Sequence, residues 1–307
     1  MCRHRITLCI LTLVVLGLTA CSTDSGEPTA PGAPTTDRIR IGSFEFAESR
    51  LLAELYSQAL EHGGFPVERK FDLGPREFVA PALANGLVDL VPEYAGAALE
   101  FLSLGAVEPS ADEAQTHRAL VQTLERTPMR ALAPSPAQDA NAFVVTHDVA
   151  ERHNLRSLSD VARVAPELTF GGPPECSSRP FCLLGLDRVY GLRFKEVVSL
   201  DAGGPVTLQA LDAGAVQMAL LFTTDPALRR SDVVELADDR GLRPADNVTP
   251  LVRADTIDRA GPRLAELVDA VSKNLTTDAL RNLNGRLAAG TDVAEVAAAW
   301  LTARSLR

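Results

Sequence analysis

The first part of the chain alternates between two spacings of apolar residues, which predict strands and helices in turn. Residues 38–43 alternate apolar and polar side chains, as a strand does, and residues 48–61 carry leucine and alanine at helical spacing. The same patterns predict strands at 67–71, 86–92 and 129–132 and helices at 76–84 and 114–126. Because strand and helix alternate, we expect a parallel sheet with right-handed crossovers.

A second block of the same kind follows and predicts a second lobe. Its expected strands are 141–146, 168–172, 194–200, 216–222 and 233–236, and its helices are 149–153, 158–163, 184–191 and 206–213. Residues 247–252 predict a strand that returns to the first lobe, before helices at 265–272, 277–285 and 293–303. We therefore expect an α/β protein with lobe 1 at 38–142 and 247–307, lobe 2 at 143–246, and a ligand cleft between them.

The stretch at residues 86–99 indicates a site. A short apolar strand ends at Pro92, Glu93 and Tyr94 follow, and small residues then begin a helix. Helix starts leave backbone N–H groups without intrahelical partners, and small residues let another group approach them. Because open α/β sheets bind ligands at the carboxyl ends of their strands, we expect Tyr94 to lie at the site.

Residues 1–20 have the pattern of a lipoprotein signal peptide. Arg3 and Arg5 precede an apolar run at 6–18 that is too short to span a membrane. The run ends Leu-Thr-Ala-Cys at 18–21, which resembles a bacterial lipobox and predicts cleavage before a lipid-modified Cys21. A plain secretory signal with an incidental cysteine is the alternative. Residues 21–37 predict a flexible tether, so we expect a lipid-anchored protein on the extracytoplasmic face of the membrane.

The net charge of the chain argues against one class of binding partner. The 307 residues include 30 Lys and Arg against 40 Asp and Glu, which gives a formal charge of −10. Nucleic-acid binding needs a basic surface, so this balance argues against nucleic acid as a partner.

Cys176 and Cys182 are the cysteines that follow Cys21. Outside the cytoplasm such a close pair predicts a disulfide, which would fix the turn that carries Arg179. A metal site is a weaker interpretation because no nearby His or Cys completes a ligand set, and a redox pair is weaker because the spacing is not Cys-x-x-Cys. Arg179 is a candidate binding group because a guanidinium forms paired hydrogen bonds to a carboxylate; an ordinary surface arginine is the alternative.

The sequence carries no catalytic or cofactor signature. It lacks a G-x-S-x-G elbow, a P-loop and an H-E-x-x-H motif, so we predict a binding protein rather than an enzyme, without metal or cofactor. The ring of Tyr94 would attract a cation by roughly 0.5–2 kcal/mol. Phe222 ends an apolar strand, and Asp246 stands where the chain returns to lobe 1. Core packing is the alternative role of the two rings, and turn formation that of Asp246.

Several short motifs occur in a specific order. They are Ile41-Gly42-Ser43, Glu93-Tyr94-x-Gly96, Gly171-Gly172-x-x-Glu175, Arg179-Pro180, Gly185-Leu186-x-x-Val189-Tyr190-Gly191 and Thr223-Thr224-Asp225. With them the chain resembles, over about residues 38–305, the osmoprotectant-type substrate-binding proteins of ABC transporters, which bind glycine betaine, choline, carnitine or proline betaine. The resemblance implies a two-lobed periplasmic-binding-protein fold of type II that closes on its ligand and delivers it to a membrane permease driven by an ATPase.

The resemblance also implies a set of binding residues. In this family aromatic rings, usually of tyrosine, enclose a trimethylammonium head, while Arg, Lys and small polar groups hold a carboxylate tail. The residues carried over are Tyr94, Asn141, Phe222 and Asp246 at the four ring positions, Arg179 at the tail position, and Phe44, Ser43 and Thr223 beside them.

Three of these positions depart from the family pattern. Asn141 and Asp246 stand in place of rings, and Phe44 stands where a lysine is frequent. An aspartate attracts a cation by its charge and also accepts hydrogen bonds from a polar ligand. Two hypotheses therefore stay open: a receptor for a quaternary amine, and the same receptor with a more polar or bulkier ligand.

Overall fold

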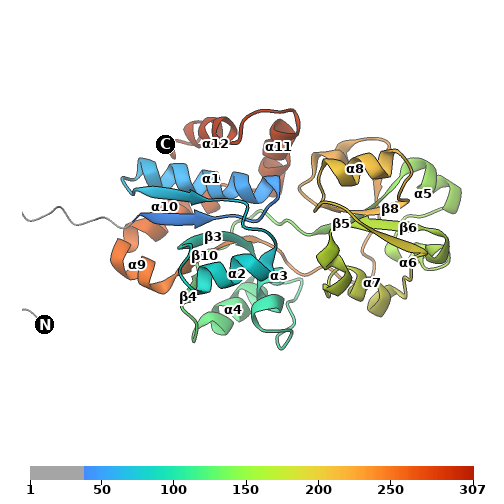
Figure 1. The fold of residues 1–307 in the computed structure, drawn as a ribbon, viewed down its shortest axis with the longest axis horizontal. Helices are drawn as coiled ribbons and strands as arrows, with labels where there is room; N and C mark the ends of the chain where they lie inside the picture. Colours follow the sequence, from blue (N-terminus) through green and yellow to red (C-terminus); the bar gives the residue numbers. More distant parts are fainter. Residues whose placement is uncertain (1–37) are drawn as a thin grey trace, which may run out of the picture. The chain divides into compact units, whose positions relative to one another are not determined.

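The computed structural model describes residues 38–307 and holds two five-stranded sheets (Figure 1). The predicted signal peptide, the tether and Cys21 lie outside the described residues. The first sheet has the order β2-β1-β3-β10-β4 and the second β7-β6-β8-β5-β9. The strands of the first sheet are β1 Ile39–Gly42, β2 Val67–Lys70, β3 Leu90–Tyr94, β4 Met129–Ala131 and β10 Val248–Arg253. Those of the second are β5 Asn141–Thr146, β6 Thr169–Gly172, β7 Glu196–Ser199, β8 Met218–Phe222 and β9 Val233–Glu235.

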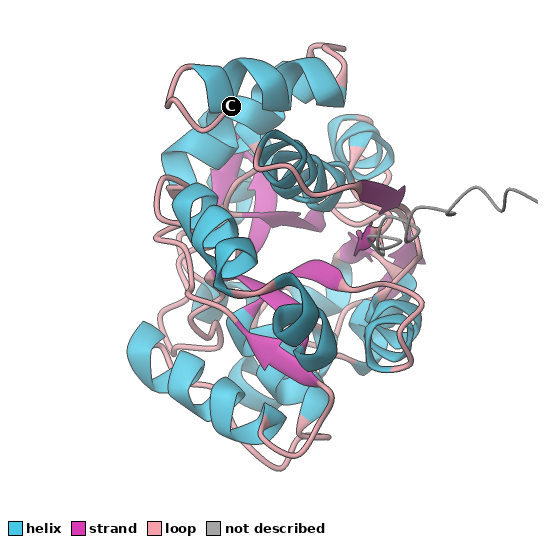
Figure 2. Ribbon diagram, turned by 90° about the vertical axis from the view of Figure 1, so that its left-hand side faces the viewer, coloured by secondary structure: helices cyan, strands magenta, loops and turns pink. Residues whose placement is uncertain are grey.

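Helices surround the strands of both sheets (Figure 2), which confirms the α/β class predicted from the alternation of spacings. The helices nearest the first sheet in the chain are α1 Ala47–His62, α2 Arg76–Ala84, α3 Ala95–Leu102, α4 Glu113–Leu124, α9 Ala254–Ala260, α10 Pro262–Ser272, α11 Thr277–Ala288 and α12 Val293–Thr302. The second block holds α5 His147–His153, α6 Leu158–Val161, α7 Leu183–Tyr190 and α8 Pro205–Asp212, with short 3-10 helices η1 Ala165–Glu167, η2 Pro174–Ser178 and η3 Pro226–Arg229.

Strand directions follow from how each strand is connected. β1 lies parallel to β2 and β3, as the alternation of strands and helices predicts, and β6 lies parallel to β7 and β8. β10 runs antiparallel to β3 and β4, and β5 runs antiparallel to β8 and β9. β5 and β10 enter their sheets directly from linkers rather than through a crossover helix, so both sheets are mixed.

The strand predicted to end at Pro92 continues through that residue to Tyr94, so the predicted end is wrong. Pro92 lies opposite Pro250 of β10 in the antiparallel register. Neither proline has an N–H to donate, and alternate pairs in an antiparallel ladder exchange no hydrogen bonds. Two prolines facing each other therefore leave the ladder intact, and Tyr94 becomes the last residue of the strand.

Helix α9 was not predicted because Ile257 is its only large apolar residue and no helical period is visible. Its role is polar. Thr256 and Arg259 hydrogen-bond the fully buried carboxylate of Asp89, which also accepts from the backbone and guanidinium of Arg40. Burial raises the pKa of Asp89, but these hydrogen bonds outweigh it and lower the pKa below its usual value. The network joins β1 and the residue that precedes β3 to α9.

Two linkers connect the sheets, residues 132–140 and 236–247 (Figure 1). They pair with each other through an antiparallel bridge between Gln138 and Asn247. The Asp139 backbone N–H also donates to the Asp246 carbonyl oxygen at 2.9 Å. The linkers therefore hold Asp139 and Asp246 as neighbours at the passage between the two sheets.

Candidate ligand-binding site

A cavity of about 150 Å³ is lined by residues of both halves of the chain, at the ends of β1, β3 and β8. Parallel strands place their carboxyl ends at one edge of a sheet, which is where α/β proteins bind ligands. Six of the eight predicted ligand-binding residues line this first cavity: Phe44, Tyr94, Asn141, Arg179, Phe222 and Asp246.

Four aromatic rings form one cluster in the wall of the first cavity. Phe46 is at its centre, stacked on Phe44 at 5.7 Å, on Tyr94 at 6.2 Å and on Phe222 at 5.8 Å between ring centroids. The family resemblance placed Tyr94 and Phe222 at two positions of one aromatic box. The ring of Phe46 bridges them, so a residue outside the family motifs completes the aromatic wall.

Phe46 and Tyr94 occupy equivalent places in their elements. Phe46 is the N-cap residue of α1 and Tyr94 that of α3, and neither side chain caps its helix by a hydrogen bond. Ser, Thr, Asp and Asn are the preferred N-cap residues, and losing such a cap costs about 1 kcal/mol. Both positions thus hold an aromatic ring where a capping residue is preferred. The helix predicted at 48–61 begins one residue later than α1, so no N-cap signal at Phe46 was visible in the sequence.

Buried polar groups hold Tyr94 in place. Its hydroxyl donates to the Glu48 Oε1 atom at 2.9 Å, and Asn284 donates to the Glu48 Oε2 atom at 2.6 Å. Burial and the nearby Glu48 carboxylate raise the pKa of Tyr94 well above its usual value, so the phenol stays neutral. A hydroxyl that donates to a carboxylate leaves the ring electron-rich, which favours a cation against its face.

Asp139 is a second buried carboxyl group beside Glu48. It accepts hydrogen bonds from the Thr224 hydroxyl at 2.8 Å and the Thr224 backbone N–H at 3.3 Å. Burial first, and then the Glu48 carboxylate, raise the pKa of Asp139 well above its usual value. Ionising Asp139 beside a second carboxylate is unfavourable, so Asp139 holds its proton more firmly than an exposed aspartate does. Sequence motifs gave no signal for Asp139, because a linker residue becomes buried only in the tertiary structure.

Asp246 lines the first cavity, but one of its carboxylate oxygens is already hydrogen-bonded within the protein. Its Oδ1 atom accepts a hydrogen bond from the Ala97 N–H at 2.8 Å, and the Ala95 N–H donates to the Asn247 carbonyl oxygen. Burial raises the pKa of Asp246 to about 6. The expectation that the start of α3 offers free N–H groups to a ligand is therefore wrong. Gly96 is required at this start because a Cβ atom there would lie 2.8 Å from the ring of Pro244.

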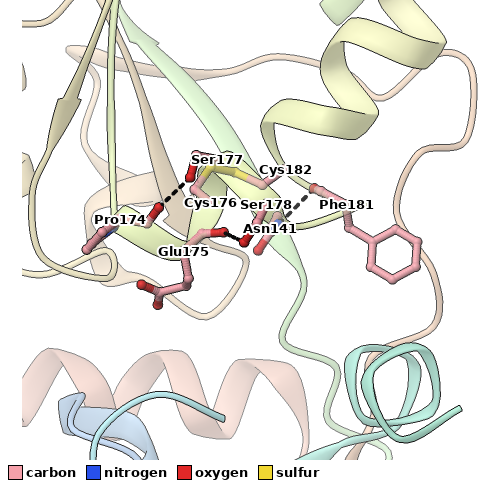
Figure 3. Close-up of a disulfide and its surroundings, with 8 residues drawn as sticks. All are labelled: Asn141, Pro174, Glu175, Cys176, Ser177, Ser178, Phe181 and Cys182. Atoms are coloured by element: carbon pink, nitrogen blue, oxygen red, sulfur yellow. Dashed lines mark hydrogen bonds between the residues drawn. A yellow bond between two sulfur atoms is a disulfide. The ribbon is translucent and has the colours of Figure 1, made fainter. Parts of the chain in front are cut away.

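Asn141 and the disulfide loop form another wall of the first cavity. Cys176 and Cys182 are joined in a disulfide, and the Asn141 side-chain amide donates to the Phe181 carbonyl oxygen at 2.9 Å (Figure 3). Asn141 therefore fastens this loop to β5, where the family pattern has a ring. Figure 3 shows the carboxylate of Glu175 projecting away from the disulfide, and Glu175 lines the cavity.

Arg179 is held by groups of the first half of the chain. Its guanidinium lies 2.9 Å from the Glu77 carboxylate and 5.3 Å from the centre of the Phe101 ring. Arg76, the other arginine that lines the first cavity, forms two hydrogen bonds of 2.9 Å with the buried Glu93 carboxylate. The predicted carboxylate-binding arginine thus already has a carboxylate partner within the protein.

The comparison with known proteins decides the family. Residues 37–303 match the family described as "Substrate binding domain of ABC-type glycine betaine transport system". The chain belongs to this family.

Individual relatives are similar over most of their length. The glycine betaine-binding protein YehZ of Escherichia coli is 28% identical over 274 residues, which cover 86% of this chain and 89% of that protein. A glycine-betaine-binding protein of Pseudomonas aeruginosa is also 28% identical, over 84% of this chain and 85% of that protein. A crystal structure of a glycine betaine/carnitine/choline ABC transporter protein has a TM-score of 0.69 at 22% identity, covering 87% of this chain and 99% of that one, which confirms the two-lobed periplasmic-binding-protein fold.

Ser43 and Thr223 lie outside the cavity of this substrate-binding domain. The Ser43 hydroxyl donates to the Phe44 carbonyl oxygen and accepts from the Asp72 N–H, and Ser43 is fully buried. The Thr223 hydroxyl accepts from the Ala140 N–H at the start of β5. Both hydroxyls are used to shape the turns that place Phe44 and Phe222, so the structure does not bring them to the predicted ligand.

A second cavity of about 650 Å³ lies next to the first in this substrate-binding domain. The two share Phe46, Phe222, Asp139 and Glu175 in their linings, so the stacked Phe46 and Phe222 rings form part of the wall of both. The second cavity also contains Glu48, Asp225 and Arg230. Burial raises the pKa of Asp225 to about 6.

Residues 38–307 of this substrate-binding domain hold no group of three or more His, Cys, Asp and Glu side chains that could bind a metal ion. Over the same residues, no helix combines the length and apolar character that crossing a membrane requires.

Gly203 supports the Phe222 ring from behind, and its replacement should move that ring. A Cβ atom at Gly203 would lie 2.8 Å from the Phe222 ring, and the residue has a left-handed φ of +65°. We expect Gly203→Ala to lose about 1 kcal/mol of stability and to weaken ligand binding. Gly214→Ala is the matched control, because Gly214 has a φ of +69° and an added Cβ meets nothing within 4 Å.

The two glycine variants are compared by thermal unfolding and calorimetric titration. Both should lose similar stability from backbone strain, whereas only Gly203→Ala should lose affinity. Equal affinities in the two variants would show that Phe222 is not a ligand-binding ring.

Proposed function

We propose that this chain is the solute-binding component of an ABC importer and that it binds a small quaternary amine in the first cavity. The cluster of Phe44, Phe46, Tyr94 and Phe222 beside buried carboxyl groups carries the proposal. Ring faces attract a cation without requiring it to form hydrogen bonds, which suits a trimethylammonium group that has no N–H to donate. The names of the relatives from Escherichia coli and Pseudomonas aeruginosa support the same ligand class.

The proposal assigns roles to the other predicted groups. Asn141 positions the disulfide loop, Asp246 adds negative charge to the cavity, and Arg179 closes the cavity against Glu77. The chain works with permease and ATPase subunits, and Cys21 carries the lipid that holds it at the extracytoplasmic face of the membrane. Catalysis is not part of the proposal, so candidate ligands incubated with the protein should be recovered unchanged.

The linkers provide the hinge for ligand-dependent closure. We assign residues 38–142 and 247–307 to lobe 1 and 143–246 to lobe 2, as the sequence predicts. β5 pairs with β8 and β9 within the second sheet, so the crossing itself falls in the linker at 132–140. This linker is hydrogen-bonded to the second linker through residues 246 and 247, so the two linkers bend together. Asp139 and Asp246 lie at the bend.

Calorimetric titration of the purified chain tests the function. Glycine betaine, choline, carnitine and proline betaine are added separately, and the co-purified ligand of the untreated protein is identified by mass spectrometry. We expect saturable binding of at least one quaternary amine. Absence of binding by all four, together with a co-purified ligand that has no cationic amine, would overturn the proposal.

The size of the second cavity favours a bulkier quaternary amine as a second candidate ligand. A head group in the first cavity would leave the second cavity, of about 650 Å³, free beside Phe46 and Phe222. A ligand with a large polar substituent would fill both cavities. Carnitine and proline betaine are the larger probes in the titration. Both carry a carboxylate, so their affinities relative to glycine betaine measure how much of the second cavity is used.

A further inference from the structure

We propose that the first cavity selects a cation that lacks a carboxylate, with choline as its simplest probe, over the zwitterion glycine betaine. The inference rests on the proposed function and adds the charge class of the ligand. Both molecules carry a trimethylammonium head, so the aromatic rings treat them alike. Selection between them depends on what the cavity offers to the other end of the ligand.

The basic side chains of the first cavity are already paired. Among the described residues that line it, Arg76 and Arg179 are the only basic ones. Arg76 is 12% exposed and makes two hydrogen bonds to the Glu93 carboxylate, and it also lies 5.2 Å from the centre of the Phe44 ring. A ligand carboxylate would have to displace a buried partner whose own charge would then be left uncompensated.

Arg179 is also unavailable to a ligand carboxylate, because Glu77 and the ring of Phe101 hold its guanidinium. Both Glu77 oxygens lie 2.9 Å from its Nη2 atom, and the guanidinium plane is covered by the Phe101 ring. Its side chain is only 19% exposed, while that of Glu77 is 45% exposed. The position that would bind a carboxylate tail therefore already holds one, supplied by α2.

The rest of the lining carries negative charge. The acidic residues around the first cavity are Glu45, Glu100, Asp139, Glu175 and Asp246. Burial raises the pKa of Asp139 well above its usual value, so Asp139 is not counted as a charge. The other four still outnumber two arginines whose charges are already compensated by Glu77 and Glu93, so the cavity has a negative potential. Attraction to the ammonium head is strengthened by this potential, whereas a carboxylate tail would face like charges with no free basic group. A hydroxyl tail can instead donate a hydrogen bond to a carboxylate.

Titration with three probes tests the inference. Choline, glycine betaine and the uncharged choline analogue 3,3-dimethylbutan-1-ol have nearly the same shape. We expect choline to bind about 10-fold or more tightly than glycine betaine, and the uncharged analogue to bind weakest. Glycine betaine binding as tightly as choline would overturn this inference and leave the proposed function intact. Absence of binding by every quaternary amine would overturn both.

Freeing Arg179 tests the physical cause. Glu77→Ala leaves the guanidinium without its carboxylate, so the affinity for glycine betaine relative to choline should rise by about 5-fold or more. Glu108→Ala is the matched control, because the Glu108–Arg188 ion pair also joins the two halves of the chain but lies outside the first cavity. The control should leave the ratio unchanged. An unchanged ratio in Glu77→Ala would show that the pairing of Arg179 does not exclude the carboxylate.

Discussion

Phe46→Ala is expected to weaken quaternary-amine binding by about 100-fold, the largest change that one ring can produce here. A desolvated cation–π contact contributes roughly 2 kcal/mol, and an aromatic pair adds about 0.5–1.5 kcal/mol beyond its buried area. Phe46 stacks on Phe44, Tyr94 and Phe222, so its removal also loosens the other rings. The combined loss of about 3 kcal/mol corresponds to a factor of about 100 in Kd.

Calorimetric titration with choline measures this loss. Phe46→Trp keeps a ring face at the same N-cap position and should retain most of the affinity. Phe78→Ala is the control for ring removal, because Phe78 lies in α2, is 65% exposed and does not line the first cavity. An affinity in Phe46→Ala within about 3-fold of the unmodified protein would rule out Phe46 as a wall of the site.

Asp139→Asn is expected to change stability and binding in opposite directions at neutral pH. The raised pKa of Asp139 shows that ionising this buried group beside Glu48 is unfavourable, so the unfolded chain loses the proton more readily. The native state therefore loses stability as the pH rises above about 4, the usual pKa of the group. Asparagine removes this penalty and keeps an oxygen for Thr224, so thermal unfolding should shift upward by a few degrees, about 2 °C for each kcal/mol.

The same substitution should weaken cation binding about 10-fold, because it removes from the lining of both cavities a carboxyl group that can ionise when a cation binds. A bound cation favours the ionised form of Asp139, so binding releases a proton and the affinity of the unmodified protein falls as the pH falls. The ionisable groups facing Asp139 are Glu48 of α1, Tyr94 at the end of β3 and, through Glu48, Asp225 after β8.

Calorimetric titration of choline from pH 5 to pH 8, in buffers of different ionisation enthalpy, measures both the affinity and the released proton. Asp139→Asn should lose most of the pH dependence and the proton release. Asp258→Asn, an exposed position of α9 outside both cavities, is the control and should behave as the unmodified protein. A pH profile of Asp139→Asn identical to that of the unmodified protein would show that this carboxyl group does not respond to the ligand.

The spacing of apolar residues along the chain was sufficient to predict the order of the strands. The apolar periods and glycine stops predicted every strand of both sheets, because strand and helix spacing are properties of neighbouring residues. They failed at Pro92, where the partner strand decides, and at α9, whose side chains serve the distant Asp89. Both failures come from contacts with residues far away in the chain.

The sequence also identified binding residues but not the contacts between them. The sequence, through the family motifs, located the corner at Tyr94 and six residues that line the first cavity. Tyr94 and Phe222 are 128 positions apart in the chain, and no local pattern reports that the ring of Phe46 bridges them. Neither the N-cap position of Phe46 nor its stacking partners were predicted, because the expected helix began at residue 48.

The sequence alone determined the two α/β blocks, the family and the class of candidate site, because these follow from periodicity and from short motifs in order. Only the tertiary structure decided which groups remain available to a ligand. Arg179 has the residue type of a carboxylate binder, yet its guanidinium is already paired with Glu77. Asp139 belongs to no motif, yet folding buries it beside Glu48 in the wall of the site, which raises its pKa well above the usual value. Availability depends on partners brought together by folding, and a residue's type and position in the chain do not specify those partners.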